Sequence, residues 1–273
     1  MRQIDYTLPK RPLGKTGLPI TRIGCGLIRI GWKWDQYKNK EIPSEAEAQT
    51  FLGYAVQRGV NFFDTAAAYG LSERRLGAFL AAHPELRSSI IVATKCGQSY
   101  DFEKDVVRPH DYSAEAIDRS ADQSLRLLGQ PIDLMQIHSL NPNQLEQELG
   151  SDKGALAAIK RLQKTGDIRY AGITFSSWDE KRYDLLDQAL KGDDFVSIQI
   201  PYNLSSPAMQ PALEIAASHN IGIIANRPLR NGLLDQRVED AMRFALSNPV
   251  ITTVLTGTAN PKHLEQNLGF LET

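Results

Sequence analysis

Cysteine is scarce in this sequence, which has only Cys25 and Cys96 among its 273 residues. Two thiols are too few for a disulfide framework or for a thiolate metal site. An excess of one charge is also lacking, because 31 basic and 32 acidic side chains leave a net charge of -1. We therefore expect no metal ion and no nucleic-acid partner, since domains that bind nucleic acids are typically strongly basic.

Long apolar runs are absent as well. The opening residues, Met1 to Tyr6, carry polar and charged side chains and lack the apolar stretch of a signal peptide. No segment of the sequence is long and apolar enough to cross a bilayer. These absences predict a cytoplasmic protein with no membrane partner, and 42% hydrophobic residues over this length can supply a large core.

What the sequence does contain is a regular alternation of short apolar segments with longer segments of helical spacing. The expected strands cover residues 23–27, 62–64, 89–94, 132–137, 168–173, 195–200, 221–225 and 251–255, and the expected helices cover 45–55, 72–82, 113–128, 153–164, 179–190, 209–218, 238–246 and 263–268. Strict alternation is typical of parallel βα units. We therefore predict a single α/β domain over residues 1–273, a (β/α)₈ TIM barrel with an N-terminal β-hairpin at residues 11–20.

A doubly wound open sheet is the rival architecture for this alternation. Its dinucleotide-binding form usually carries a Gly-x-Gly-x-x-Gly turn after the first strand. Here Gly24 and Gly26 are followed by Ile28 and Arg29, with no glycine in the third place. The missing fingerprint favours the barrel, whose usual length of roughly 250 residues also fits this chain.

Ionisable side chains stand at the ends of three successive expected strands. Asp64 ends the second strand, Lys95 follows the third and His138 follows the fourth. Active sites of such barrels form at the carboxyl ends of the strands, so these side chains are expected to converge on one mouth. Tyr69 lies in the loop after Asp64 and is expected to hang over the same mouth.

This group of side chains predicts acid–base chemistry on a carbonyl compound. A buried carboxylate needs a cationic partner, so Asp64 is expected to pair with Lys95. The Lys95 ammonium is then expected to lower the pKa of the Tyr69 phenol. Tyr69 would donate a proton to a carbonyl oxygen that His138 orients. Taken singly, each residue also has an ordinary structural interpretation, and a Schiff-base aldolase with Lys95 as nucleophile is an alternative.

These four residues and their surroundings resemble the catalytic tetrad of the aldo-keto reductase superfamily. The matching motifs are Phe63-Asp64-Thr65-Ala66 with Tyr69-Gly70, Ala93-Thr94-Lys95, residues 124–129, Asp133-Leu134 through Ile137-His138, and Gly257-Thr258 with Asn260-Pro261 and Asn267. The resemblance covers nearly the whole chain, and the short tail after Leu268 is similar to that of bacterial-type members. It implies a TIM barrel that binds an extended nicotinamide dinucleotide and transfers hydride reversibly between NAD(P)H and a carbonyl compound.

The resemblance also implies which positions hold the nicotinamide. Gln199 matches the amide of strand six that binds the carboxamide of the ring. Relatives carry Ser-Asn after strand five and a stacking aromatic after strand seven, where this chain has Thr174-Phe175 and Asn226. The next residue, Arg227, is a candidate cation for the pyrophosphate.

At the adenosine end, the resemblance places the cofactor against the last helix, whose N-terminus favours anions. The matching residues are Gly257, Thr258, Asn260, His263, Gln266 and Asn267. Relatives committed to NADPH often carry Lys at position 257 and Arg at position 263, and this chain has neither. A 2′-phosphate needs cations, and a near-neutral histidine is a weak substitute, although Lys262 and Arg227 are candidate replacements. The habit of the family favours NADPH and the residues at positions 257 and 263 favour NADH, so the choice between NADP and NAD stays open.

We therefore predict an NAD(P)-dependent aldo-keto reductase that acts on a small-molecule carbonyl or alcohol. Oxidation of an alcohol or aldose is the alternative direction, and a non-catalytic nucleotide-binding barrel is a further alternative. Trp32, Trp34 and Tyr100 lie in loops after strands one and three and are candidate walls of the substrate pocket. The sequence gives neither the substrate nor the oligomeric state.

Overall fold

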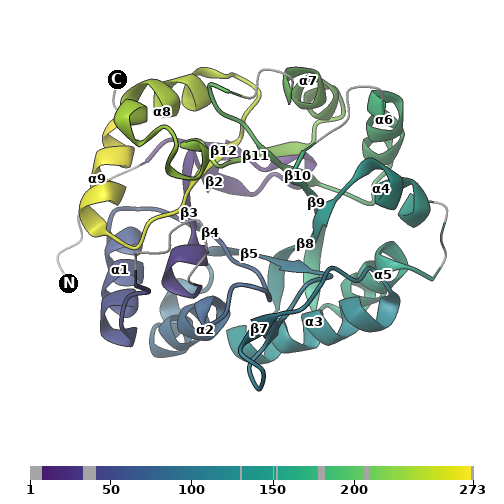
Figure 1. Ribbon diagram of the computed structural model, residues 1–273, viewed down its shortest axis with the longest axis horizontal. Helices are drawn as coiled ribbons and strands as arrows, with labels where there is room; N and C mark the ends of the chain where they lie inside the picture. Colours follow the sequence, from purple (N-terminus) through teal and green to yellow (C-terminus); the bar gives the residue numbers. More distant parts are fainter. Residues whose placement is uncertain are drawn as a thin grey trace.

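Eight parallel strands form a closed barrel at the centre of the computed structural model, and helices surround it (Figure 1). The structure describes residues 8–32, 41–129, 131–149, 151, 153–177, 182–205 and 209–271. Around the barrel the strands are β3 Ile23–Gly26, β4 Phe62–Asp64, β5 Ile91–Cys96, β8 Ile132–Leu140, β9 Ile168–Phe175, β10 Ser197–Pro201, β11 Gly222–Asn226 and β12 Thr253–Thr256, and β12 pairs with β3. The predicted (β/α)₈ barrel is confirmed.

The helices follow the strands in the predicted alternation. They are α1 Glu45–Gln57, α2 Ser72–Ala82, α3 Ala114–Leu128, α4 Pro142–Leu149, α5 Ala155–Thr165, α6 Tyr183–Lys191, α7 Gln210–Ser218, α8 Val238–Ser247 and α9 Pro261–Gly269. Short 3₁₀ turns include η2 Leu27–Ile30 directly after β3. None of the helices formed by the described residues has the length and apolar character needed to cross a membrane.

The predicted N-terminal hairpin is also confirmed. β1 Lys10–Pro12 pairs antiparallel with β2 Pro19–Thr21, so that Arg11 faces Ile20. Leu13 and Ile20 are fully buried against barrel residues. The backbone at Gly14 packs directly on residues 220–222, which lead into β11. The hairpin therefore covers the amino end of the barrel and leaves the carboxyl end free for a site.

Alternation along the strands gives the barrel an apolar lower layer and a polar upper layer. Side chains two residues apart on a strand share a face. Phe62, Ile91, Ala93 and Leu134 pack with Leu13 inside the barrel. The upper layer consists of buried polar residues that stand two positions further along the same strands. They are Asp64 after Phe62, Lys95 after Ala93 and Gln136 after Leu134. Lys95 therefore lies within β5 and His138 within β8, where the sequence had placed both at strand ends.

A short hairpin and a helix were not predicted. The loop after β5 contains a small hairpin, β6 Tyr100–Asp101 paired with β7 Val106–Val107, and strands of two residues are too short to show alternation. Helix α4 begins with a reciprocal cap, in which the backbone N–H of Asn141 donates to Gln144 Oε1 and that of Gln144 donates to Asn141 Oδ1. This capping-box pattern is readable in the sequence and would have located the helix.

Candidate active site

A buried ion pair lies at the carboxyl end of the barrel. Lys95 Nζ lies 2.5 Å from Asp64 Oδ2 and donates to the Thr65 carbonyl at 2.8 Å. Gln136 Nε2 donates to the other carboxylate oxygen at 3.1 Å. Asp64 and Lys95 are 2% and 1% exposed. The predicted pairing is confirmed, and hydrogen bonds from neighbouring groups compensate much of the cost of burying both charges.

The charge of Lys95 is fixed by this partner. Burial alone would lower the pKa of the Lys95 ammonium, but the facing charge of Asp64, together with Tyr69, outweighs burial and raises it. Lys95 therefore stays protonated at neutral pH. Burial raises the pKa of Asp64, with Lys95 acting against that shift.

Tyr69 reaches the pair from the loop between β4 and α2. Its ring centroid lies 5.1 Å from Lys95 Nζ. Two contacts hold the loop: Ser72 Oγ donates to the Leu27 carbonyl at 3.0 Å and is within 2.8 Å of Thr65 Oγ1. Gly70 adopts φ +54, and a Cβ at this residue would overlap the backbone of Gly31, so the close turn after Tyr69 requires glycine.

The predicted direction of the Tyr69 pKa shift is wrong for the site as it stands. Burial raises the pKa of Tyr69 above its ordinary value, and the nearby Lys95 charge acts against this without cancelling it. Desolvation disfavours the phenolate more than a single cation favours it. Tyr69 is therefore protonated at neutral pH, which is the form that a proton donor needs.

His138 faces Tyr69 from β8, with ring centroids 5.9 Å apart. Burial, with the charges of Lys95, His110 and Arg227, lowers the pKa of His138 well below its ordinary value, so the imidazole is neutral. Its Nδ1 is buried and has no hydrogen-bond partner among the described residues. We assign the proton to Nε2, because a buried N–H without an acceptor is costly. His138 can then donate a hydrogen bond to a substrate oxygen.

The strand is irregular next to His138. The pairing of β8 with β9 shifts register between Ile137 and Leu140, and Ser139 has φ +56. Tyr112 Oη donates to the carbonyl of His138 at 2.7 Å. This bulge and its hydrogen bond fix the backbone on which the imidazole is mounted.

These side chains open onto a cavity of about 1170 Å³, which is large enough for a dinucleotide and a small substrate together. Asp64, Tyr69, Lys95 and His138 all border it. Among the described residues no group of three or more His, Cys, Asp or Glu side chains is arranged to hold a metal ion.

The predicted substrate walls are only partly present on this cavity. Trp32 borders it. Tyr100 is not among the residues that border it, and its ring packs against that of Trp32 at a centroid distance of 5.1 Å. Trp34 lies outside the described residues. Sequence reasoning missed His110, whose ring lies 5.5 Å from that of His138 on the same cavity. Nothing in its local sequence marks it, because the loop before α3 brings it there.

Two amides of the cavity suit the nicotinamide end of a cofactor. Gln199 is 3% exposed, and its Oε1 has no hydrogen-bond partner among the described residues. The Oδ1 of Asn226, on the neighbouring strand, is also buried without a hydrogen-bond partner among the described residues. Both residues border the cavity. Unpartnered buried acceptors of this kind fit the carboxamide N–H groups of a nicotinamide.

Thr174, which stands where relatives carry serine, also borders the cavity. Its Oγ1 accepts the backbone N–H of Ser139 at 2.7 Å, and its hydroxyl proton can still be donated. Phe175 lines the cavity beside it with an apolar ring. Thr174 therefore keeps the hydroxyl of the Ser-Asn pair of relatives, and Phe175 replaces its amide with an apolar ring.

The far end of the cavity is formed by the loop before α9 and by the helix itself. The predicted adenosine-side residues all border it: Gly257, Thr258, Asn260, His263, Gln266 and Asn267. Asn260 caps α9 by accepting the backbone N–H of Lys262 at 2.9 Å. Arg227 borders the cavity too, and its charge adds to the lowering of the His138 pKa and acts against the rise that burial causes in the Tyr69 pKa.

Comparisons with known proteins cover nearly the whole chain. Residues 22–241 match the model of the aldo/keto reductase family. L-galactose dehydrogenase of Arabidopsis thaliana is 28% identical, and the alignment covers 94% of this chain and 86% of that protein. D-threo-aldose 1-dehydrogenase of a Pseudomonas species is 28% identical, with 92% and 89% covered. A solved structure assigned to the aldo-keto reductases of Pseudomonas aeruginosa superposes with a TM-score of 0.80 at 29% identity, covering 99% of this chain and 96% of that one.

Proposed function

The chain belongs to the aldo/keto reductase family and is an NAD(P)-dependent oxidoreductase of carbonyls and alcohols, and we propose that Tyr69, Lys95, Asp64 and His138 carry its chemistry. The observation that supports this most directly is the buried Lys95–Asp64 pair with the Tyr69 ring 5.1 Å from Lys95 Nζ, all on one cavity. The same pair speaks against an aldolase, because a Schiff-base lysine must be neutral to attack.

In the reducing direction, Tyr69 donates its phenolic proton to the carbonyl oxygen of the substrate. Lys95 holds down the pKa of that phenol against the effect of burial, and Asp64 keeps Lys95 charged and in place. His138 donates from Nε2 to the same oxygen and orients the carbonyl. In the oxidising direction, Tyr69 must first lose its own proton, and its phenolate oxygen then accepts the proton of the alcohol.

A bound nicotinamide dinucleotide supplies or accepts the hydride in this reaction. Gln199, with Asn226 beside it, would hold the carboxamide of the nicotinamide. Arg227 would bind the pyrophosphate, since a guanidinium is well suited to phosphate oxygens. Residues 257–267 would hold the adenosine half against the N-terminus of α9.

We further propose a hydroxylated, sugar-like substrate. Two relatives are named as dehydrogenases of L-galactose and of D-threo-aldoses. Trp32 offers a flat apolar face on the cavity, and His110, Ser139 and Ser176 place polar groups around it. An aromatic ring with several hydrogen-bonding groups is a combination that suits a sugar ring.

Turnover of aldoses with NAD⁺ and NADP⁺, followed by the absorbance of the reduced nicotinamide, tests the proposal. We expect oxidation of at least one aldose by the native protein and almost none by Tyr69→Phe. Borohydride treatment in the presence of a carbonyl compound is the complementary test. A covalent adduct on Lys95 together with no redox turnover would replace the reductase by an aldolase.

A further inference from the structure

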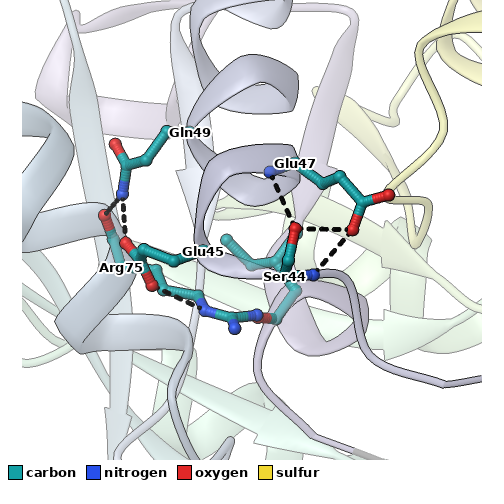
Figure 2. A network of polar contacts seen from close by, with 6 residues as sticks. Ser44, Glu45, Glu47, Gln49 and Arg75 are labelled. Atoms are coloured by element: carbon teal, nitrogen blue, oxygen red, sulfur yellow. Dashed lines mark hydrogen bonds and ion pairs between the residues drawn. The ribbon is translucent and has the colours of Figure 1, made fainter.

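Glu47 carries a fixed negative charge at the start of α1. Its Oε2 accepts hydrogen bonds from the backbone N–H and the Oγ of Ser44, each at 2.7 Å, and the backbone N–H of Glu47 donates to Ser44 Oγ at 3.3 Å. Figure 2 shows this capping box at the first turn of the helix. The hydrogen bonds from Ser44 lower the pKa of Glu47 below its ordinary value, so the carboxylate is ionised at neutral pH.

The position of Glu47 puts this charge on the cofactor cavity. Glu47 borders the cavity together with Asn260 and His263 of the α9 end. Helices α1 and α9 lie side by side (Figure 1) and are joined by Arg58, which binds the Glu265 carboxylate at 2.7 Å. In Figure 2 the Glu47 side chain points toward the yellow segment that belongs to the C-terminal part of the chain. Its Oε1 has no hydrogen-bond partner among the described residues.

Neither α9 nor the loop before it brings a strong cation to the cavity. The residues of 257–267 that border the cavity include neither Lys nor Arg. Lys262 stands in the first turn of α9 but does not border the cavity. The cations that do border it come from other elements: Arg29 from η2, Lys95 from β5 and Arg227 from the end of β11.

A ribose 2′-hydroxyl and a 2′-phosphate make opposite demands on such a wall. The hydroxyl donates a hydrogen bond to a carboxylate, as it does to the acidic residue of many dinucleotide sites. A phosphate is repelled by the same carboxylate and requires cations. We propose that Glu47 selects NAD(H) over NADP(H) by accepting from the adenosine ribose and by repelling a 2′-phosphate. This inference rests on the proposed function and makes it more specific.

Direct binding measurements test the inference without relying on turnover. Dissociation constants for NADH and NADPH are measured by nicotinamide fluorescence for the native protein, Glu47→Gln and Glu47→Lys. We expect the native protein to bind NADH about tenfold or more tightly than NADPH. Glu47→Gln should reduce this ratio about fivefold to tenfold, mainly by strengthening NADPH, because it removes one like charge. Glu47→Lys should reduce the ratio further or reverse it.

Glu45→Gln is the matched control. Glu45 belongs to the same helical turn, but its carboxylate pairs with Arg75 at 3.1 Å (Figure 2) and does not border the cavity. The Glu45→Gln variant should leave the ratio of the NADH and NADPH dissociation constants unchanged. Two results would overturn the inference while the reductase assignment stands. One is tighter binding of NADPH than of NADH by the native protein. The other is a ratio of dissociation constants in Glu47→Gln that equals the native ratio. Binding of neither dinucleotide would overturn the proposed function and this inference with it.

Discussion

Lys95 Nζ lies 2.5 Å from Asp64 Oδ2, and both side chains are almost completely buried above an apolar barrel interior. The arrangement leaves neither charge alone, because Thr65 and Gln136 complete the hydrogen bonding. A buried ion pair gives little net stability, yet removing one partner leaves an uncompensated charge. The pair is therefore best explained by its effect on Tyr69.

The pair makes a prediction about folding stability. Asp64→Asn and Lys95→Met should each lower the free energy of unfolding by about 3–5 kcal/mol, because each leaves one buried charge without its partner. The double variant buries neither charge, so its free energy of unfolding should fall by clearly less than the sum of the two single losses. Urea denaturation of the four proteins measures this coupling, and strictly additive losses would show that the two charges do not stabilise one another.

Tyr69→Phe should separate chemistry from binding. Loss of the proton donor should lower kcat by about 10²–10⁴-fold. The affinity for the dinucleotide should stay close to that of the native protein, because the ring and its packing are kept. Steady-state kinetics and fluorescence titration measure the two quantities. A turnover number near the native value would exclude Tyr69 as the acid.

The barrel and the polar residues of its mouth were predictable because they depend on local pattern. Alternation of strand and helix defined the fold, and the two-residue period of a strand carried the inward face from Phe62 to Asp64. Chain order alone then brought Asp64, Lys95 and His138 to one end. These relations need no knowledge of side-chain packing.

What the sequence did not reveal depends on tertiary contacts. His110 reaches the cavity through an irregular loop, and Tyr100 packs on Trp32 without bordering the cavity. The direction of the Tyr69 pKa shift depends on how completely the site is desolvated, which no local pattern reports. In the sequence, Ser44 and Glu47 form a Ser-x-x-Glu pattern that indicates only a helix cap, because the place of Glu47 on the cavity depends on the packing of α1 beside α9.

A second buried carboxyl group gives a pH-dependent prediction. Glu73 accepts a hydrogen bond from Thr94 Oγ1 at 2.5 Å, and burial raises the pKa of Glu73 from 4.5 to about 7. Between these values the folded protein keeps a proton that the unfolded chain has released, so stability falls as the pH rises through this window. The full loss above the folded pKa is on the order of 3 kcal/mol.

Glu73→Gln removes this titration and keeps an acceptor for Thr94. Its stability relative to the native protein should therefore rise from about pH 5 to about pH 8, as measured by urea denaturation across that range. Glu214→Gln, at an exposed position on α7, is the control. Its curve of unfolding free energy against pH should run parallel to that of the native protein. A parallel curve for Glu73→Gln as well would mean that Glu73 does not titrate on unfolding.

The packing of α2 against α3 depends on a glycine that no functional argument involves. A Cβ at Gly77 would overlap the backbone carbonyl of Leu127, which cannot move without shifting α3. On α1, a Cβ at Gly53 would meet only Phe79 Cε2 at 3.8 Å, an ordinary contact. The same substitution should therefore have opposite effects at the two sites.

Gly77→Ala should lower the free energy of unfolding by about 1–3 kcal/mol through overpacking. Gly53→Ala should raise it by about 0.5–1 kcal/mol, because alanine loses less backbone freedom than glycine when a helix forms. Thermal and urea unfolding of both variants measure the difference. If Gly77→Ala were as stable as Gly53→Ala, the backbone of α3 would lie farther from α2 than the structure places it, and Gly77 would be dispensable for the packing of these two helices.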